Sequence, residues 1–179
     1  MLFRSAACVR ELLQDDNVRV PARIVHAIEG GGSLFVMPAS DAQVAMTKLI
    51  TFVAGNPGRG LPAIQGDVIV FDPSNGQRQV ILHGPTVTAR RTAAVSLLAA
   101  QTLAPNPNGP LLIVGAGVQG KSHLEAFALG LGVKDVRIAS RSRASADALV
   151  AHAQNMGLKA QRVDDAEDRK STRLNSSHG

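Results

Sequence analysis

The chain has 179 residues, 45% of them hydrophobic and 18% charged, which suits a globular protein of one domain or two small ones. No apolar run approaches the roughly 20 residues needed to cross a bilayer, and no signal peptide is apparent. The single cysteine, Cys8, excludes an internal disulfide and fits a reducing cytoplasm, where we expect the protein to reside. Cys8 falls in a helical pattern and is expected to be buried.

The formal net charge of +5 depends on the last residues of the chain. Residues 169–179 (RKSTRLNSSHG) contain three basic and no acidic side chains and show no apolar periodicity. Without them 16 basic and 14 acidic residues remain, so we expect no nucleic-acid-binding surface. We interpret the segment as a non-native tail that resembles translated adapter sequence. The alternative is a genuine disordered basic tail.

The first part of the chain predicts short strands around turns, followed by one long helix. Residues 6–14 have the pattern of an amphipathic helix, and Pro73–Gly76 is a hairpin signal between two strands. The pair Gly84–Pro85 is expected to stop the sheet, with Thr86 or Thr88 capping the next helix. The predicted strands are residues 18–28, 34–39, 42–54, 66–72 and 77–83, and the predicted helix is residues 86–103.

The second part opens on a strand and a glycine turn that are typical of a dinucleotide-binding βαβ unit. The apolar run Leu111–Val114 leads directly into Gly115-x-Gly117-x-x-Gly120. Gly115 allows a sharp turn, Gly117 allows close approach of a pyrophosphate, and Gly120 allows close helix packing. The helix N-terminus then offers free N–H groups to phosphates. The alternative is a strand–helix turn without a ligand. The predicted elements that follow are a helix over residues 119–130, a strand over 133–140, a helix over 145–156 and a strand over 158–163.

The predicted fold class is therefore α/β. An antiparallel-rich first domain over residues 6–104 precedes a truncated Rossmann domain over residues 110–168. The five histidines are scattered, and no metal-ligand spacing is present, so we expect no metal site.

The end of the second Rossmann strand predicts the cofactor. NAD-specific sites usually carry Asp or Glu there to bind the ribose 2′-OH. This chain has Ser140-Arg141-Ser142, in which Arg141 can pair with a 2′-phosphate and the serines can donate hydroxyls. NADP(H) is therefore favoured over NAD(H). The alternative is that Arg141 and Arg143 belong to a solvated loop.

Several sequence blocks resemble the ornithine cyclodeaminase/mu-crystallin family over about residues 6–165. The combination of Thr-x-x-Arg-Thr-Ala-Ala with Gly-Ala-Gly-Val-Gln is specific, far more so than the glycines alone. The matching blocks are Pro38–Lys48, Leu61–Gly66, Asp72–Gly76, Thr88–Ala94, and Val114–Gln119 with the following His123.

Within that family the chain is most similar to ketimine reductases. The resemblance implies that residues 6–104 bind substrate and form a homodimer. It also implies NAD(P)H-dependent reduction of Δ1-pyrroline-2-carboxylate or Δ1-piperideine-2-carboxylate to L-proline or L-pipecolate. The alternatives are an NAD-dependent, ammonia-releasing ornithine cyclodeaminase and a non-enzymatic protein that binds NADPH and a small ligand. No nucleic acid or membrane partner is expected.

The resemblance also implies a substrate site. Arg23 and Arg91 match positions that bind the substrate carboxylate, and Lys48 matches a position near the imine, where it would help in binding or proton transfer as a catalytic residue. Lys48 lies among apolar neighbours, where a charge needs a reason to be present. The alternative for each is an exposed charge on a sheet face. Met37 fits a pocket position, although a core methionine is equally plausible.

The candidate cofactor-binding residues combine the glycine turn, the end of the second Rossmann strand and one threonine. They are Gly115, Gly117, Val118, Gln119, Gly120, Ser140, Arg141, Ser142 and Thr88.

The family's catalytic aspartate is expected downstream of the resemblance, because Asp164 and Asp165 come too early to match it. The third Rossmann strand is predicted to have an unpaired edge and an exposed apolar face. We therefore expect the 179-residue chain, made as written, to be inactive and prone to aggregate.

Overall fold

The computed structural model describes residues 2–163, so the predicted tail over 169–179 and Asp164 and Asp165 lie outside the described residues. The chain divides into two compact units. One is residues 11–88, and the other combines residues 1–10 with residues 89–179. Two helices cross this boundary, α1 (Leu2–Gln14) and α2 (Gly84–Leu103).

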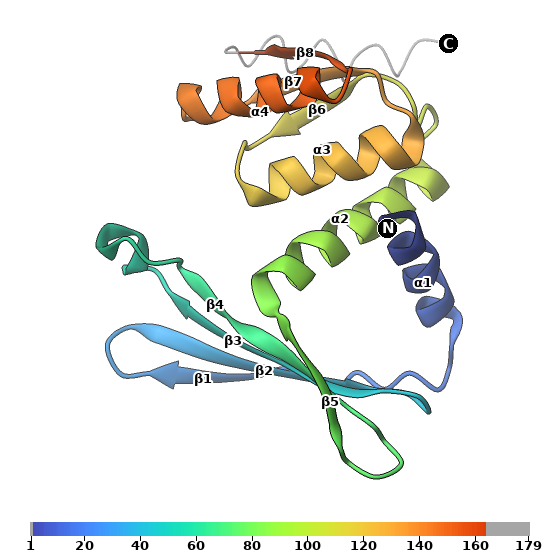
Figure 1. The fold of residues 1–179 in the computed structure, drawn as a ribbon, viewed down its shortest axis with the longest axis vertical. Coiled ribbons are helices and arrows are strands. Elements are labelled where there is room, and N and C mark those ends of the chain that lie inside the picture. The colour runs from blue at the N-terminus through green and yellow to red at the C-terminus, as the bar shows by residue number, and fades with distance from the viewer. Residues whose placement is uncertain (1, 164–179) are drawn as a thin grey trace. The chain divides into compact units, whose positions relative to one another are not determined.

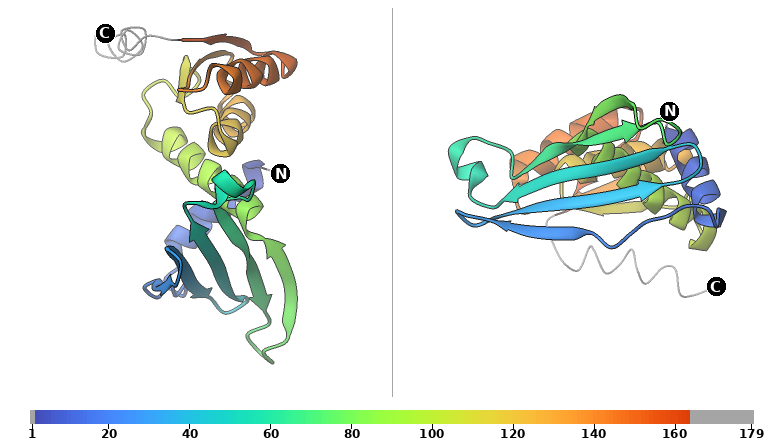
Figure 2. Two further views of the ribbon diagram at one scale, coloured as in Figure 1. Left: turned by 90° about the vertical axis from the view of Figure 1, so that its left-hand side faces the viewer. Right: turned by 90° about the horizontal axis from the view of Figure 1, so that it is seen from below.

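The unit formed by residues 11–88 is built on a five-stranded antiparallel sheet in which the strands follow chain order (Figure 2). Each strand pairs with the next along the chain, as in a meander. A short 3-10 helix, η1 (Asn56–Arg59), lies between the third and fourth strands. The strands are β1 (Ile24–Ile28), β2 (Gly32–Ser40), β3 (Ala45–Val53), β4 (Ile64–Phe71) and β5 (Arg78–His83).

Among the boundaries that differ from the sequence-based expectation, three have a clear local reason. Strand β1 begins at Ile24 rather than at residue 18, because Pro21 has no N–H to donate to a ladder. Strand β3 begins only at Ala45, because the Asp41 carboxylate accepts the N–H groups of Gln43 and Val44, each at 2.7 Å, in a side-chain-stabilised turn. Helix α2 begins at Gly84, with Pro85 in its first turn, where a missing N–H costs nothing.

Two expectations for single side chains are wrong. Cys8 on α1 is exposed rather than buried. Neither Thr86 nor Thr88 caps the helix, because both lie inside α2, and the Oγ1 of Thr86 is 2.8 Å from Nδ1 of His83.

The other unit contains a three-stranded parallel sheet in the order β6-β7-β8. Helices α3 and α4 cover one face of this sheet (Figure 1). Its core is aliphatic, with Leu124, Val136 and Ile138 fully buried. This βαβαβ arrangement matches the predicted Rossmann order. The elements are β6 (Leu111–Val114), α3 (Val118–Leu131), β7 (Asp135–Ala139), α4 (Arg143–Asn155) and β8 (Lys159–Arg162).

Strand β8 corrects the expectation of an exposed apolar face. Among the described residues β8 pairs only with β7, so its outer edge is open. Its apolar side chain, Ala160, is buried, as are the flanking Leu158 and Val163, whereas Lys159 and Gln161 are exposed. The exposed face of β8 is therefore polar.

Helix α2 packs closely on α3 through small residues. Ala93 and Ala126 are both fully buried where the helices meet. A Cβ on Gly130 would lie 2.5 Å from a methyl group of Leu97, so a side chain there would displace the buried Leu97. The packing fixes α3, which follows the glycine turn, against the second half of α2.

Candidate functional site

The glycine turn after β6 has a conformation that depends on glycine at two of its three positions, Gly115 and Gly120. Gly115 has φ +108°, a conformation that L side chains rarely adopt, and its N–H donates to the carbonyl of Ala139 at 2.8 Å. A Cβ on Gly120 would lie 2.0 Å from the Gly115 carbonyl oxygen. The turn is thus closed on itself and bonded to the end of β7.

Gly117 differs from Gly120 because a Cβ there would meet nothing within 4 Å, and it differs from Gly115 because its φ is −85° rather than positive. Its extended backbone also tolerates a side chain, so protein packing gives no reason for glycine at this position. Gly117 caps α3 without a side-chain hydrogen bond, and the first N–H groups of the helix have no intrahelical acceptor. Open space in front of free N–H groups and a helix dipole fits a pyrophosphate.

Apolar side chains border the turn and remain open to solvent. Val114 is 68% exposed and Val118 is 72% exposed. Gln119 is also exposed, although its carbonyl accepts a hydrogen bond from His123. Val118 and Gln119 are therefore accessible to a ligand, as the motif predicts.

The carboxyl end of β7 carries the residues that were predicted to choose the cofactor. Ser140 is half-buried, and Arg141 and Ser142 are exposed. Ser142 caps α4, its Oγ accepting the N–H of Ser145 at 3.2 Å and the Ser145 hydroxyl at 3.0 Å. Because both bonds are accepted, the Ser142 hydroxyl hydrogen is left to donate to a ligand oxygen.

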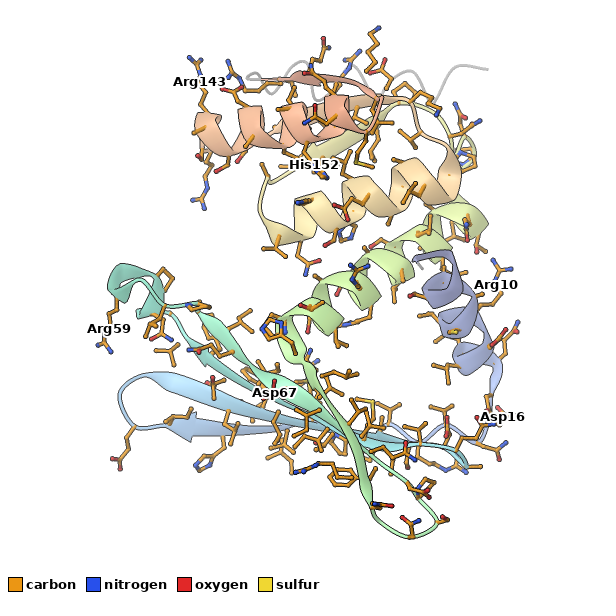
Figure 3. The ribbon with its side chains drawn as sticks, in the orientation of Figure 1. Arg10, Asp16, Arg59, Asp67, Arg143 and His152 are labelled. Carbon is orange, nitrogen blue, oxygen red and sulfur yellow. The ribbon has the colours of Figure 1, made fainter. Side chains whose placement is uncertain are left out.

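The two carboxylates of α3 and α4 nearest this region are each bonded to a basic group. Glu125 lies 3.0 Å from Nε2 of His152, and Asp147 lies 2.6 Å from the Arg162 guanidinium. His152 points from α4 toward α3 (Figure 3). Among residues 2–163, the segment that follows β7 is Ser140-Arg141-Ser142-Arg143, which contains no carboxylate to repel a phosphate.

His123 links the glycine turn to α2, a role that the sequence did not indicate. Its Nδ1 lies 2.7 Å from the Gln119 carbonyl oxygen, and its Nε2 lies 2.9 Å from Ser96 Oγ. Since a carbonyl can only accept, Nδ1 carries the hydrogen. The spacing of four residues between Gln119 and His123 was the only signal for this contact, and Ser96 had none.

The sheet register brings three of the predicted substrate residues to one face. Met37 on β2 lies directly opposite Lys48 on β3, and Lys48 lies opposite the buried Val68 on β4. Arg23 precedes β1, and continuing the register by one residue pairs it with Met37. Arg23 is exposed, whereas Met37 and Lys48 are half-buried. The basic residues Arg23 and Lys48 and the apolar residues Met37 and Val68 therefore lie in one row across the sheet.

The remaining two predicted residues lie on α2. Arg91 is exposed and belongs to the unit of residues 89–179, so its membership in one pocket with the sheet residues stays a prediction. Thr88 is half-buried, and its Oγ1 is buried without a hydrogen-bond partner among the described residues. Buried hydroxyls are rarely left unpaired, and a ligand oxygen would satisfy this one.

Residues 2–163 contain neither a membrane-spanning helix nor a cluster of metal-ligating side chains. No helix there is both long and apolar enough to cross a membrane. Within the same residues no group of three or more His, Cys, Asp or Glu side chains could hold a metal ion.

The fold and the glycine turn define an α/β protein with a Rossmann-type half. The profile of the ornithine cyclodeaminase/mu-crystallin family matches residues 6–172, and the chain belongs to that family.

Curated relatives include two reductases. Ketimine reductase mu-crystallin from Rattus norvegicus is 41% identical over 143 residues, which cover 78% of this chain and 46% of the relative. Delta(1)-pyrroline-2-carboxylate reductase 1 from Burkholderia multivorans is 44% identical over 107 residues, covering 60% of this chain and 34% of the relative. The chain thus spans less than half the length of these relatives.

A solved structure shares the fold. It is Thermococcus litoralis Delta(1)-pyrroline-2-carboxylate reductase in complex with NADH and L-proline, with a TM-score of 0.83 and 23% sequence identity. The match covers 93% of this chain and 53% of that one.

Proposed function

We propose that this protein is an NAD(P)H-dependent ketimine reductase that acts on cyclic imino acids. The observation that carries the proposal is the glycine turn, where Gly117 faces open space although packing would tolerate a side chain. Relatives named ketimine reductase and Delta(1)-pyrroline-2-carboxylate reductase, at 41% and 44% identity, support the substrate class. The proposed products are L-proline from the five-membered ring and L-pipecolate from the six-membered ring.

The preferred cofactor in this proposal is NADP(H). Gly115, Gly117 and Gly120 shape the turn, and Val118 and Gln119 contribute the first N–H groups of α3 to the pyrophosphate. Thr88 contributes its unpaired hydroxyl.

The 2′-phosphate of the cofactor would be held at the end of β7. The Arg141 guanidinium binds the phosphate through two hydrogen bonds, and the hydroxyls of Ser140 and Ser142 donate hydrogen bonds to it. When bound, the reduced nicotinamide supplies the hydride that the imine carbon accepts.

The chain's own residues bind and orient the imino acid. Arg23 and Arg91 hold the substrate carboxylate, Met37 contributes an apolar wall, and Lys48 lies near the imine nitrogen, where it binds the ring or delivers a proton. The register of Met37 against Lys48 supports this assignment. These residues contribute orientation and electrostatic stabilisation.

The proposal extends to organisation. Residues 6–104 form the substrate and dimerisation domain, residues 110–168 begin the nucleotide domain, and the protein works as a homodimer in the cytoplasm. Helix α2 follows the sheet and precedes β6, so it connects the two domains along the chain.

The reaction is tested with protein expressed from its source gene, mixed with NADPH and Δ1-pyrroline-2-carboxylate. We expect NADPH consumption with formation of L-proline, faster than with NADH. Arg141→Ala should narrow the difference between the cofactors, whereas Arg59→Ala on the exposed 3-10 helix should leave it unchanged. Ammonia release from ornithine with NAD, or NADPH binding without turnover, would overturn the reductase assignment.

A further inference from the structure

A cleft of about 500 Å³ opens between α3 and α4, beside the glycine turn. Gly117 and Lys121 line it from the α3 side, and Ser145, Leu149 and His152 line it from α4. Much of its remaining lining is small and apolar, so Lys121 is the one lining residue with a permanent charge. A cation at the border of an apolar cleft suits a nucleoside that carries a phosphate group.

The cleft continues the predicted cofactor site rather than forming a separate one. Gly117 belongs both to its lining and to the turn that would hold the pyrophosphate. Ser145 donates its hydroxyl to Ser142, the residue at the end of the β7 loop. The cleft therefore runs from the pyrophosphate position toward the Ser140–Ser142 segment, the direction in which the adenosine half of a dinucleotide extends.

Lys121 stands one turn into α3, past the N–H groups that would bind the pyrophosphate. The first helical hydrogen bond of α3 runs from the Lys121 N–H to the Gly117 carbonyl at 3.0 Å, so its backbone is already used. Its exposed side chain lines the cleft from α3, across from the lining residues of α4. The carboxylate of Glu125, on the same helix, is bonded to His152.

From this arrangement we infer that Lys121 is a specificity-determining residue that binds the 2′-phosphate of NADP(H) from the α3/α4 cleft. It is a second cation, opposite Arg141 across the phosphate, and the apolar lining covers the adenosine. The inference rests on the proposed function, because it requires a phosphorylated dinucleotide in the glycine turn.

The test is Lys121→Ala in the 179-residue chain, with NADPH and NADH titrated separately and bound nucleotide followed by its own fluorescence. NADPH affinity should fall about tenfold or more, as expected for the loss of a hydrogen bond to a charged group, while NADH affinity changes less than about twofold. The loss should shrink as salt is raised, because an exposed cation is screened.

The matched control is Lys134→Ala, which removes the same charge from an exposed position just before the amino end of β7, remote from the glycine turn. It should leave both affinities unchanged. Thermal unfolding should be the same for both variants, because both lysines are exposed.

Two results overturn the inference while leaving the proposed function intact. If Lys121→Ala lowers NADPH and NADH affinity equally, the lysine acts on the shared part of the cofactor. If neither affinity changes, Lys121 makes no contact with it. By contrast, a folded unmutated chain that binds neither nucleotide, or that prefers NADH, contradicts the proposed function itself.

Discussion

Glycines with different surroundings in one turn offer a test at the scale of single residues. Gly120→Ala puts a Cβ 2.0 Å from a backbone oxygen, so the turn must shift, at a cost of about 1–3 kcal/mol. Gly117→Ala meets nothing in the protein and should cost under about 1 kcal/mol, as a poorer helix cap. Thermal unfolding should therefore detect Gly120→Ala much more strongly than Gly117→Ala.

Gly117→Ala, the variant expected to remain stable, should nevertheless lose nucleotide affinity. The Cβ of Gly117→Ala would occupy the space left for the pyrophosphate, so NADPH affinity should fall about tenfold or more without comparable loss of stability. A Gly117→Ala variant that binds NADPH as tightly as the unmutated chain would show that the open space is not a ligand site.

The roles of the turn glycines could be predicted from the sequence, because the motif fixes their backbone geometry. The contacts of His123 and Lys121 could not, because they depend on how α3 is rotated against α2 and α4. No spacing along the chain predicts that Ser96 meets His123 or that Lys121 borders a cleft with Ser145.

Among the elements, the β4–β5 hairpin carries a pH-dependent turn. Hydrogen bonds from the Ser74 hydroxyl (2.6 Å) and the Ser74 N–H (2.8 Å) lower the pKa of the Asp72 carboxyl below its ordinary value. Since the folded-state pKa is the lower one, this contribution to stability is present above the unfolded pKa and is lost as the pH falls through the folded value.

Asp72→Asn should therefore reduce the pH dependence of unfolding in acid. We expect the urea midpoint of the unmutated chain to fall more steeply below about pH 4 than that of the variant, with no such difference in slope near neutrality. The control is Asp15→Asn, which makes the same substitution at an exposed aspartate in the turn after α1, outside the hairpin. Parallel acid profiles for the unmutated chain and Asp72→Asn would refute the role of this turn.

Element identity was predictable wherever apolar periodicity and turn residues agreed, as in the helix at residues 84–103 and the strands around Pro73–Gly76. The boundaries of the elements were less predictable, because they depend on side-chain hydrogen bonds and on the positions of prolines. The turn of Asp41 delays β3, and Pro21 shortens β1 enough to leave Arg23 outside the strand. The substrate residues on the sheet were therefore predicted from the family resemblance. Only the strand register shows that they lie on the same face of the sheet.

For the molecule as a whole, we propose that the glycine turn after β6 holds the nicotinamide dinucleotide. The turn is also distinct from the glycines of the β1–β2 hairpin, Gly30 and Gly31, which have positive φ but no helix N-terminus beside them.

The most direct measurement is NADPH titration of the ¹⁵N-labelled 179-residue chain, followed by the assigned amide signals of its glycines. We predict saturable shifts at Gly115, Gly117 and Gly120, while Gly30 and Gly31 stay in place. Shifts confined to glycines of residues 11–88, or no shifts in a folded chain, would contradict the assignment of the cofactor site.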